Sequence, residues 1–226
     1  MILFEQANPL WEEKYSSGLA QYYPWDAVVS FIYHYAPKNK PRHQIKILEV
    51  GCGSGPNLWF AAREGFNVTG IDGSNSAIKI VKSRFQSEGL TGEFKVVNFS
   101  EDLPFESNNF DLVIDRAAIT YCGEKISNKL ISEIHRVLSP AGKFFFNPYS
   151  DKHGSFLCGE NGHDGMTTKI RGGSVMNTGD ILFYSKKEII KKLESFKILR
   201  LSHLELADLK EANESIHAEW RVIVEK

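Results

Sequence analysis

The sequence has little net charge and few cysteines. Its 27 basic and 28 acidic residues give a formal net charge of −1. A balanced charge does not attract a polyanion or an anionic membrane, so we expect neither nucleic acid nor membrane as a partner. The three cysteines, Cys52, Cys122 and Cys158, show no C-x-x-C spacing. This pattern indicates a reducing compartment and argues against a metal site or a disulfide framework.

Long apolar runs and targeting signals are also missing. No stretch reaches membrane-spanning length, and the first six residues lack a basic region followed by an apolar core. We therefore expect a cytoplasmic protein. The 226 residues suffice for one α/β domain with an insertion or appended segments.

The most informative stretch is a glycine-rich turn. An apolar run over residues 46–50 ends there, and Pro56 then opens a helical pattern. Glycine adopts positive φ and lets a ligand approach the backbone, and a helix start presents free N–H groups. The turn has three alternating glycines: Gly51, Gly53 and Gly55. The pattern predicts a strand, a turn and a helix that bind a nucleoside.

A second apolar run, residues 67–71, ends at Asp72, whose carboxylate is placed to accept hydrogen bonds from ribose hydroxyls. The dinucleotide fingerprint requires glycine at position 56, where this chain has Pro56. With Glu49 before the turn, the pattern is acidic-x-Gly-x-Gly-x-Gly. It resembles the first signature of the class I S-adenosylmethionine-dependent methyltransferases, in which this turn holds the methionine end and ribose of the cofactor.

Residues 101–114 strengthen this resemblance. They contain Leu103-Pro104-Phe105 and then Phe110-Asp111-Leu112-Val113, similar to the family's D-x-L-P-F and F-D-L-V block. The resemblance covers roughly residues 45–147. It implies a doubly wound, seven-stranded, mostly parallel sheet with an antiparallel last strand. Its ligand cleft would lie at the carboxyl ends of the strands.

The remaining segments complete a single-domain organisation. Residues 1–44 are expected to form a helical cover, with helices near 9–18 and 24–35. Residues 45–147 are expected to form the cofactor-binding core. Residues 148–180 have little periodicity and are interpreted as a substrate lid. Residues 181–226 predict a final helix and two strands. That helix begins with a Ser185–Glu188 capping box, and its expected inward residues are Ile189, Ile190 and Leu193, with Lys186, Lys187, Lys191 and Lys192 solvated.

The resemblance implies a set of cofactor-binding residues. Glu49 would orient the methionine amino group, and Asp72 would bind the ribose. Asn98 would accept a hydrogen bond from the adenine amino group, with Asp102 as a competing candidate. The full set is Trp11, Tyr15, Glu49, Gly51, Cys52, Gly53, Gly55, Asp72, Gly73, Asn98, Phe99, Asp115 and Arg116.

Catalytic residues are less well defined. Alignment of donor and acceptor supplies much of the rate of methyl transfer, but an oxygen acceptor benefits from a base. The leading candidates are Asp115, Tyr149 and His153. Other polar residues near the strand ends are Tyr121, Asp151, His163 and Asp164, with Arg116 and Arg171 as candidates to hold an anionic group. His217, beside the final strand, can face either the cleft or solvent.

The sequence thus predicts methyl transfer from S-adenosylmethionine to an O, N or C nucleophile of a small molecule. Two alternatives stay open. A nicotinamide-dependent oxidoreductase would also place Asp72 on a ribose, but Pro56 and the 101–114 block disfavour it. A cofactor-binding module without catalysis would bind S-adenosylmethionine equally well. The oligomeric state is not defined by the sequence.

Overall fold

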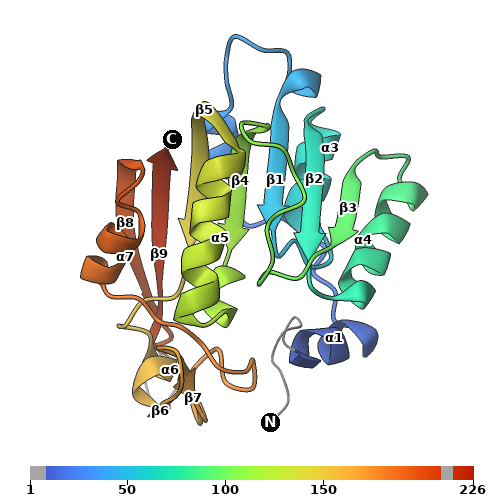
Figure 1. Ribbon diagram of the computed structural model, residues 1–226. Helices are drawn as coiled ribbons and strands as arrows, with labels where there is room; N and C mark the ends of the chain where they lie inside the picture. The colour runs from blue at the N-terminus through green and yellow to red at the C-terminus, as the bar shows by residue number, and fades with distance from the viewer. Residues whose placement is uncertain (1–8, 210–215) are drawn as a thin grey trace.

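The computed structural model describes residues 9–209 and 216–226, so residues 1–8 of the expected helical cover lie outside the described part. A seven-stranded sheet has the order β3-β2-β1-β4-β5-β9-β8 (Figure 1). Only β9 runs antiparallel to its neighbours, β5 and β8. The predicted fold class is therefore confirmed. The strands of this sheet are β1 (Lys46–Val50), β2 (Asn67–Asp72), β3 (Glu93–Val96), β4 (Phe110–Arg116), β5 (Leu138–Asn147), β8 (Lys197–Ala207) and β9 (Ile216–Glu225).

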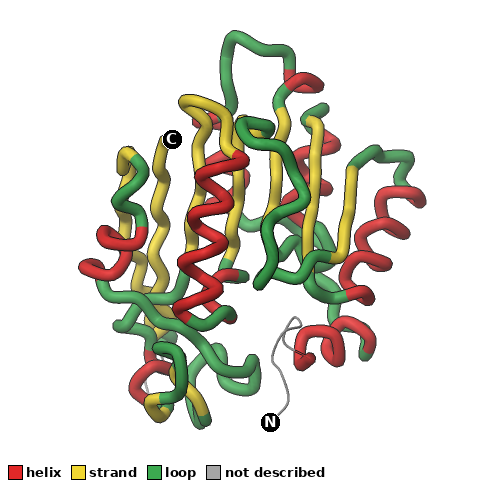
Figure 2. Tube along the Cα trace, viewed as in Figure 1, coloured by secondary structure: helices red, strands yellow, loops and turns green. Residues whose placement is uncertain are grey.

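Helices cover both faces of the sheet (Figure 2). Side chains of α2 (Asp26–Tyr35), α3 (Pro56–Arg63) and α4 (Asn75–Ser87) form one apolar core with the sheet. Side chains of α5 (Glu124–Val137) and α7 (Lys186–Lys192) form the other. The remaining helical elements are α1 (Pro9–Ser16), α6 (Gly154–Leu157) and the 3-10 helices η1 (Arg42–Gln44) and η2 (Ile119–Tyr121).

The central strands are apolar along their whole length because both faces are covered. In β5, the neighbouring residues Phe144, Phe145 and Phe146 alternate between the two cores, and all three are buried. This strand begins at Leu138, and its pairing with β4 is broken between Phe110 and Leu112.

Helix α7 confirms the predicted capping box but corrects its predicted faces. Ser185 and Glu188 form both hydrogen bonds of the box, and Ile189 and Leu193 are buried. Ile190 is 44% exposed, because adjacent positions on a helix differ by about 100°. Lys192 was expected in solvent, yet its side chain is 4% exposed and its Nζ lies 3.1 Å from Glu124 Oε1. The last turn of α7 faces α5, which removes this lysine from water.

Residues 148–184 are packed rather than structureless. They contain α6 and a small antiparallel pair, β6 (Glu160–Asn161) with β7 (Thr167–Thr168). Apolar side chains of this segment form a third cluster with Ala117, which follows β4. In Figure 1 the segment lies at the end of the sheet where β5 ends and β9 begins. It is therefore placed at the edge where a ligand cleft was predicted.

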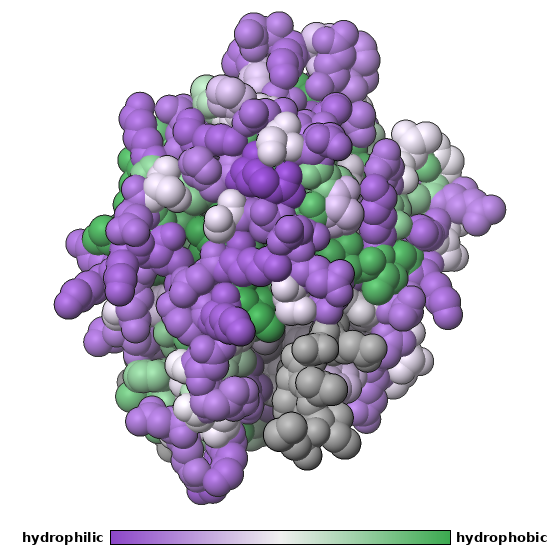
Figure 3. Space-filling view, viewed as in Figure 1, coloured by the Kyte–Doolittle hydropathy of each residue, from purple (hydrophilic) through white to green (hydrophobic). Residues whose placement is uncertain are grey.

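The outer surface shown in Figure 3 is mostly hydrophilic, with apolar side chains in small groups. Small groups of this kind are normal for a folded domain. Among the described residues, no helix has the length and apolarity needed to span a bilayer.

Candidate functional site

The glycine turn between β1 and α3 has the backbone that its sequence predicts. Gly51, Gly53 and Gly55 have φ values of 68°, 53° and 75°. L-residues with a side chain rarely adopt this region. An added Cβ would overlap Ala118 at Gly51, the Tyr15 hydroxyl at Gly53 and Val81 at Gly55. All three positions therefore need glycine for space as well as for conformation.

Asp72 ends β2 beside this turn. Its Oδ2 accepts from the Gly53 N–H at 2.8 Å, and its Oδ1 accepts from the Ser74 N–H at 2.8 Å. Burial raises the pKa of Asp72, and these two hydrogen bonds oppose that rise. Each carboxylate oxygen has a second lone pair, so the group can accept two further hydrogen bonds from a ligand. Gly73 lies between these contacts as the first residue after β2.

Glu49 lies one residue before the end of β1 and is 2% exposed. Its Oε1 accepts from Asn57 Nδ2 at 2.6 Å, whereas its Oε2 has no hydrogen-bond partner among the described residues. Burial raises the pKa of Glu49 to about 8. An unpartnered buried carboxylate oxygen is costly, so this atom suits a cationic or N–H-bearing ligand group.

Asp115, in β4, is a second buried carboxylate. Its Oδ1 accepts from the N–H groups of Ala118 at 3.0 Å and Ile119 at 2.8 Å. Burial raises the pKa of Asp115 to about 7, although these amides, Arg116 and the Asn147 N–H act to lower it. The hydrogen bonds of Oδ1 fix the turn after β4, which gives Asp115 a structural contribution beside any role toward a ligand.

Helix α1 lies over the glycine turn and the start of α4. Glu12 accepts from the hydroxyls of Ser74 and Ser76, each at 2.6 Å, and these bonds lower its pKa to about 2. Tyr15 reaches Gly53 with its hydroxyl, and burial raises the pKa of that hydroxyl. Trp11 packs edge-on against Tyr121, with ring centroids 5.0 Å apart. Tyr15 thus contacts the glycine turn, whereas Trp11 contacts Tyr121, which follows β4.

The segment between α1 and α2 covers the N-terminus of α3. The Gln21 N–H donates to Ser54 Oγ at 2.9 Å, and Ser54 Oγ donates back to the Gln21 carbonyl at 2.8 Å. The Trp25 N–H donates to Asn57 Oδ1 at 3.0 Å. The side chains of Ser54 and Asn57 at the start of α3 are therefore engaged by this segment.

The predicted adenine end is formed by the loop after β3. Asn98 uses its side-chain carbonyl within this loop, accepting from the Ser100 N–H at 3.1 Å and hydroxyl at 2.9 Å. Phe99 is partly buried against the apolar core. Asp102, the competing candidate, is 81% exposed and pairs with Lys129 at 3.0 Å. Both lone pairs of the Asn98 carbonyl are thus used within the loop, so the side-chain geometry does not favour Asn98 over Asp102 as the acceptor for adenine.

Cys52 contributes only its backbone to the turn. Its side chain is buried in the core on the α3 side, where its Sγ would be 2.8 Å from a Cβ on Gly70. Burial raises the pKa of the Cys52 thiol well above its usual value. The thiol therefore stays protonated and inert.

The contacts of Arg116 argue against its predicted role in holding the cofactor or an anionic acceptor. Its guanidinium carbon lies 4.0 Å from the Trp25 ring centroid, and its Nη2 lies 3.3 Å from Glu219 Oε2. The charge that was expected to hold the cofactor or an anionic acceptor is thus already engaged by protein groups. The pairing of Arg116 with Glu219 could not be predicted from the sequence, because the two residues are far apart in the chain. They meet only when β9 joins the sheet beside β5.

The contacts of His153 also argue against its predicted catalytic role. It is fully buried and is the N-cap of α6, where its Nδ1 accepts from the Ser155 N–H at 3.0 Å. Its other nitrogen, Nε2, lies 3.2 Å from Ser174 Oγ. Burial, and then His217, lower the pKa of His153 to about 4. Since both ring nitrogens are engaged, His153 has no free lone pair with which to take a proton from a substrate.

Tyr149 lies in a row of aromatic rings that leads away from the glycine turn. Its ring centroid is 6.3 Å from that of Tyr121 and 5.7 Å from that of His217. The Tyr121 hydroxyl is hydrogen-bonded with Tyr149 and Thr178, and burial raises its pKa. With Trp11 on the far side of Tyr121, these rings form one wall from α1 to β9, which we call the aromatic row.

Two site residues were not anticipated from the sequence. Glu12 holds α1 in place, and Glu219 is a buried carboxylate that lies between Arg116 and Arg221. Burial favours the neutral form of Glu219, but His217, Arg116 and Arg221 lower its pKa to about 2. A signal for Glu219 exists, because His217, Glu219 and Arg221 alternate with apolar residues along one strand.

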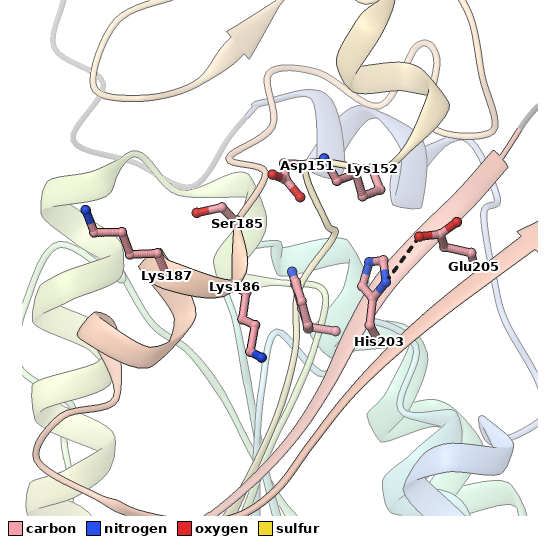
Figure 4. Close-up of a pocket in the computed structure, with 8 residues that line it drawn as sticks. Asp151, Lys152, Ser185, Lys186, Lys187, His203 and Glu205 are labelled. Atoms are coloured by element: carbon pink, nitrogen blue, oxygen red, sulfur yellow. Dashed lines mark ion pairs between the residues drawn. The ribbon is translucent and has the colours of Figure 1, made fainter.

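A separate open hollow of about 380 Å³ lies on the α7 side of β8 and β9 (Figure 4). Lys152, Lys186 and Lys187 surround it, and His203 pairs there with Glu205 at 3.3 Å. None of the predicted cofactor residues lines this hollow. In the described ranges, no group of three or more His, Cys, Asp or Glu residues is arranged to hold a metal ion.

Comparisons with known proteins agree with the geometry of the turn. The methyltransferase-domain family model matches residues 47–142. A putative methyltransferase of Geobacillus is 32% identical over 129 residues, 56% of this chain and 51% of that protein. The first curated relatives are covered over 35% to 51% of their length, so the chain spans about half of them or less.

Solved structures share the fold. A crystal structure of an S-adenosylmethionine-dependent methyltransferase from Methanosarcina mazei has a TM-score of 0.69 at 24% identity, covering 90% of this chain and 98% of that one. A 1,6-didemethyltoxoflavin-N1-methyltransferase from Burkholderia thailandensis, solved with its substrate and S-adenosylhomocysteine, has a TM-score of 0.62 at 17% identity. The match covers 88% of this chain and 76% of that one. These likenesses extend beyond the turn to the whole sheet.

Proposed function

Since the chain belongs to the class I S-adenosylmethionine-dependent methyltransferases, we propose that it binds S-adenosylmethionine at the glycine turn and methylates a small-molecule nucleophile. The observation that carries the proposal is the unpartnered Oε2 of Glu49 beside three glycines with positive φ. A methionine ammonium group is a cation that would satisfy this oxygen, and the glycines leave the backbone open to it.

The other predicted residues fit the rest of the cofactor. Asp72 has lone pairs left for two ribose hydroxyls, and Gly73 continues the backbone past it. Asn98 and Phe99 are at the expected adenine position. Tyr15 and Trp11 would cover the bound molecule from α1. When bound, the cofactor supplies an electrophilic methyl group on a sulfonium with a good leaving group.

The acceptor would lie between the glycine turn and the 148–180 segment, along the aromatic row. Such a wall can align a flat or apolar acceptor, and alignment supplies much of the rate in methyl transfer. Asp115, fully buried at the end of β4, would position the turn that carries Tyr121. Tyr149 would contact the acceptor directly.

Pro56 opposes the nicotinamide alternative. It stands where the dinucleotide fingerprint has glycine, and it has no N–H to offer a pyrophosphate at this helix start. The side chains of Ser54 and Asn57 are also bonded to the segment before α2.

Calorimetric titration with S-adenosylmethionine, S-adenosylhomocysteine and NAD tests the proposal. We expect both sulfur nucleosides to bind and NAD not to bind. Asp72→Ala should weaken binding by about a hundredfold or more, because two ribose hydrogen bonds to a charged group are worth about 1.5–3 kcal/mol each. Binding of NAD alone would overturn the proposal. Ser30→Ala, on the far side of α2, serves as the control.

Binding of both sulfur nucleosides, followed by release of S-adenosylhomocysteine in the presence of a panel of small phenols, alcohols and amines, separates an enzyme from a cofactor-binding module. The module alternative predicts binding without release for every compound.

A further inference from the structure

Four hydrogen-bonded side chains connect the 148–180 segment to β9 at the end of the aromatic row. Ser174 Oγ lies 3.2 Å from His153 Nε2 and 3.2 Å from His217 Nδ1. His217 Nε2 lies 3.3 Å from Glu219 Oε2. We call His153, Ser174, His217 and Glu219 the histidine relay.

The two ends of the relay fix its direction independently. A backbone N–H only donates, so the bond from Ser155 leaves His153 Nδ1 without a proton and places the proton on Nε2. At the other end a carboxylate only accepts, so His217 carries its proton on Nε2, toward Glu219. Ser174 therefore accepts from His153 and donates to His217. The lone pair of His217 Nδ1 is the place to which the next proton can go.

Only the middle of the histidine relay is exposed to solvent. His153 and Glu219 are buried at its ends, whereas Ser174 is exposed and the His217 side chain is 26% exposed. Glu219 is held in its charged form by Arg116 at 3.3 Å and Arg221 at 2.7 Å. A carboxylate on one ring nitrogen raises the proton affinity of the other.

The remaining neighbours of His217 are apolar or aromatic. The ring of Tyr149 packs edge-on against it, with centroids 5.7 Å apart, and Leu206 lies opposite it on β8. Among the described residues, the titratable groups that face it are therefore His153, Tyr149 and Glu219, and beyond Glu219 the two arginines. A proton gained by His217 would be balanced by Glu219.

We propose that His217 receives the proton that a methyl acceptor with an O–H or N–H group loses, with Ser174 passing the proton on. In this step the O–H or N–H bond of the acceptor breaks and its electron pair stays on the acceptor atom. The proton moves to Ser174 Oγ while the proton of Ser174 moves to His217 Nδ1. Glu219 and His153 are positioning residues. The inference rests on the proposed function and adds to it the chemical class of the acceptor.

The same geometry narrows the acceptor further. Arg116 is engaged by Trp25 and Glu219, so it is not available to pair with an anionic acceptor. The row of Trp11, Tyr121 and Tyr149 rings favours a flat ring system. We therefore expect a neutral aromatic compound with a hydroxyl or ring N–H.

The first experiment follows the histidine ring nitrogens by NMR in the ¹⁵N-labelled full chain, without any ligand. We expect His153 and His217 to carry their protons on Nε2 when neutral. Glu219→Gln removes the carboxylate that only accepts, so it should reduce the fraction of neutral His217 that carries its proton on Nε2. Glu205→Gln removes the equivalent carboxylate from His203 on the neighbouring strand and is the matched control (Figure 4). It should leave His217 unchanged.

A proton on Nδ1 of neutral His217, or a tautomer ratio of His217 that Glu219→Gln does not change, would overturn the inference. The second experiment measures release of S-adenosylhomocysteine against pH with the panel of small phenols and amines. We expect an acid limb of kcat/KM in the wild-type chain that is lost in His217→Gln, because His217 is the proton acceptor. An acid limb that persists unchanged in His217→Gln would also overturn it.

These results separate the inference from the proposed function. Binding of S-adenosylmethionine, measured by calorimetry, depends on the glycine turn and not on the relay. If His217→Gln and Ser174→Ala bind the cofactor normally but show wild-type pH profiles, the relay is wrong and the proposed cofactor stands. If the wild-type chain does not bind the cofactor, the proposed function fails whatever the NMR experiment shows.

Discussion

The glycine-turn region and the relay region place their ionisable groups in opposite situations. In the glycine-turn region, Glu49 and Asp115 are buried, and burial outweighs the opposing effect of Arg116, so their pKa values rise to about 8 and about 7. In the relay region, the pKa of His153 falls to about 4 and that of Glu219 to about 2. The first region is arranged to receive a positive charge, because Glu49 Oε2 has no hydrogen-bond partner among the described residues. In the second region, internal hydrogen-bond partners fix the position of each proton, as a proton relay requires.

The largest expected effect is a loss of stability caused by a substitution in the glycine-turn region. Gly51→Ala should lower the free energy of unfolding by roughly 3 kcal/mol, combining about 1–2 kcal/mol for a left-handed backbone with about 1–3 kcal/mol for the overlap with Ala118. Urea unfolding measures the change. Gly89→Ala is the matched control, because Gly89 has φ +65° and no atom within 4 Å of an added Cβ. An equal loss in both variants would show that the packing against Ala118 does not matter.

The second prediction uses pH to compare the two regions. The folded pKa of His153 is below its unfolded value of about 6.5, so its contribution to stability is full above pH 6.5 and is lost as the pH falls toward 4. We expect a loss of about 2 kcal/mol over this range, and His153→Gln should remove it. Urea unfolding from pH 4 to pH 7 provides the measurement.

Glu49 should act in the opposite direction. The folded pKa of Glu49 is raised, so its contribution to the free energy of unfolding is full below pH 4.5 and is lost as the pH rises toward 8. Glu49→Gln should remove the fall in stability between pH 4.5 and pH 8, which urea unfolding extended to pH 8 measures. If Glu49→Gln and His153→Gln changed the slope of the stability profile in the same direction, the contrast between the regions would be incorrect.

Cofactor binding should sharpen the contrast. Near pH 7, Glu49 is largely protonated in the free protein, and an ammonium group beside it would favour the carboxylate. Binding of S-adenosylmethionine should therefore release up to about one proton. Calorimetry in buffers of different ionisation enthalpy measures the number released. Glu49→Gln should abolish the release, and an unchanged release would assign it to another group.

The smallest expected effect concerns the cover over the turn. Glu12→Gln weakens the hold of α1 on Ser74 and Ser76, so S-adenosylmethionine should dissociate a few-fold faster. Stopped-flow fluorescence of Trp11 measures this rate. Glu13→Gln, on the same helix but exposed, is the control. Equal rates for both variants would mean that Glu12 does not hold the cover closed over a ligand.

Local sequence predicted the fold and the glycine turn well because the physics there is local. Strand periodicity, a capping serine and glycines that must adopt positive φ are properties of neighbouring residues. The seven-stranded sheet with an antiparallel last strand came from the resemblance of those motifs to a family, and the structure confirmed it. The role of Tyr15 and Trp11 toward a cofactor came from the same resemblance and stays a prediction.

The sequence by itself determined where a cofactor turn would form, because three glycines and an acid at fixed spacing leave the backbone few other conformations. Only the tertiary structure decided which polar groups are free. Arg116 and His153 lie next to promising motifs in the chain, but Glu219 and Ser174, distant in sequence, engage them. Whether a side chain has a partner depends on which strand enters the sheet beside it, and no local pattern carries that information.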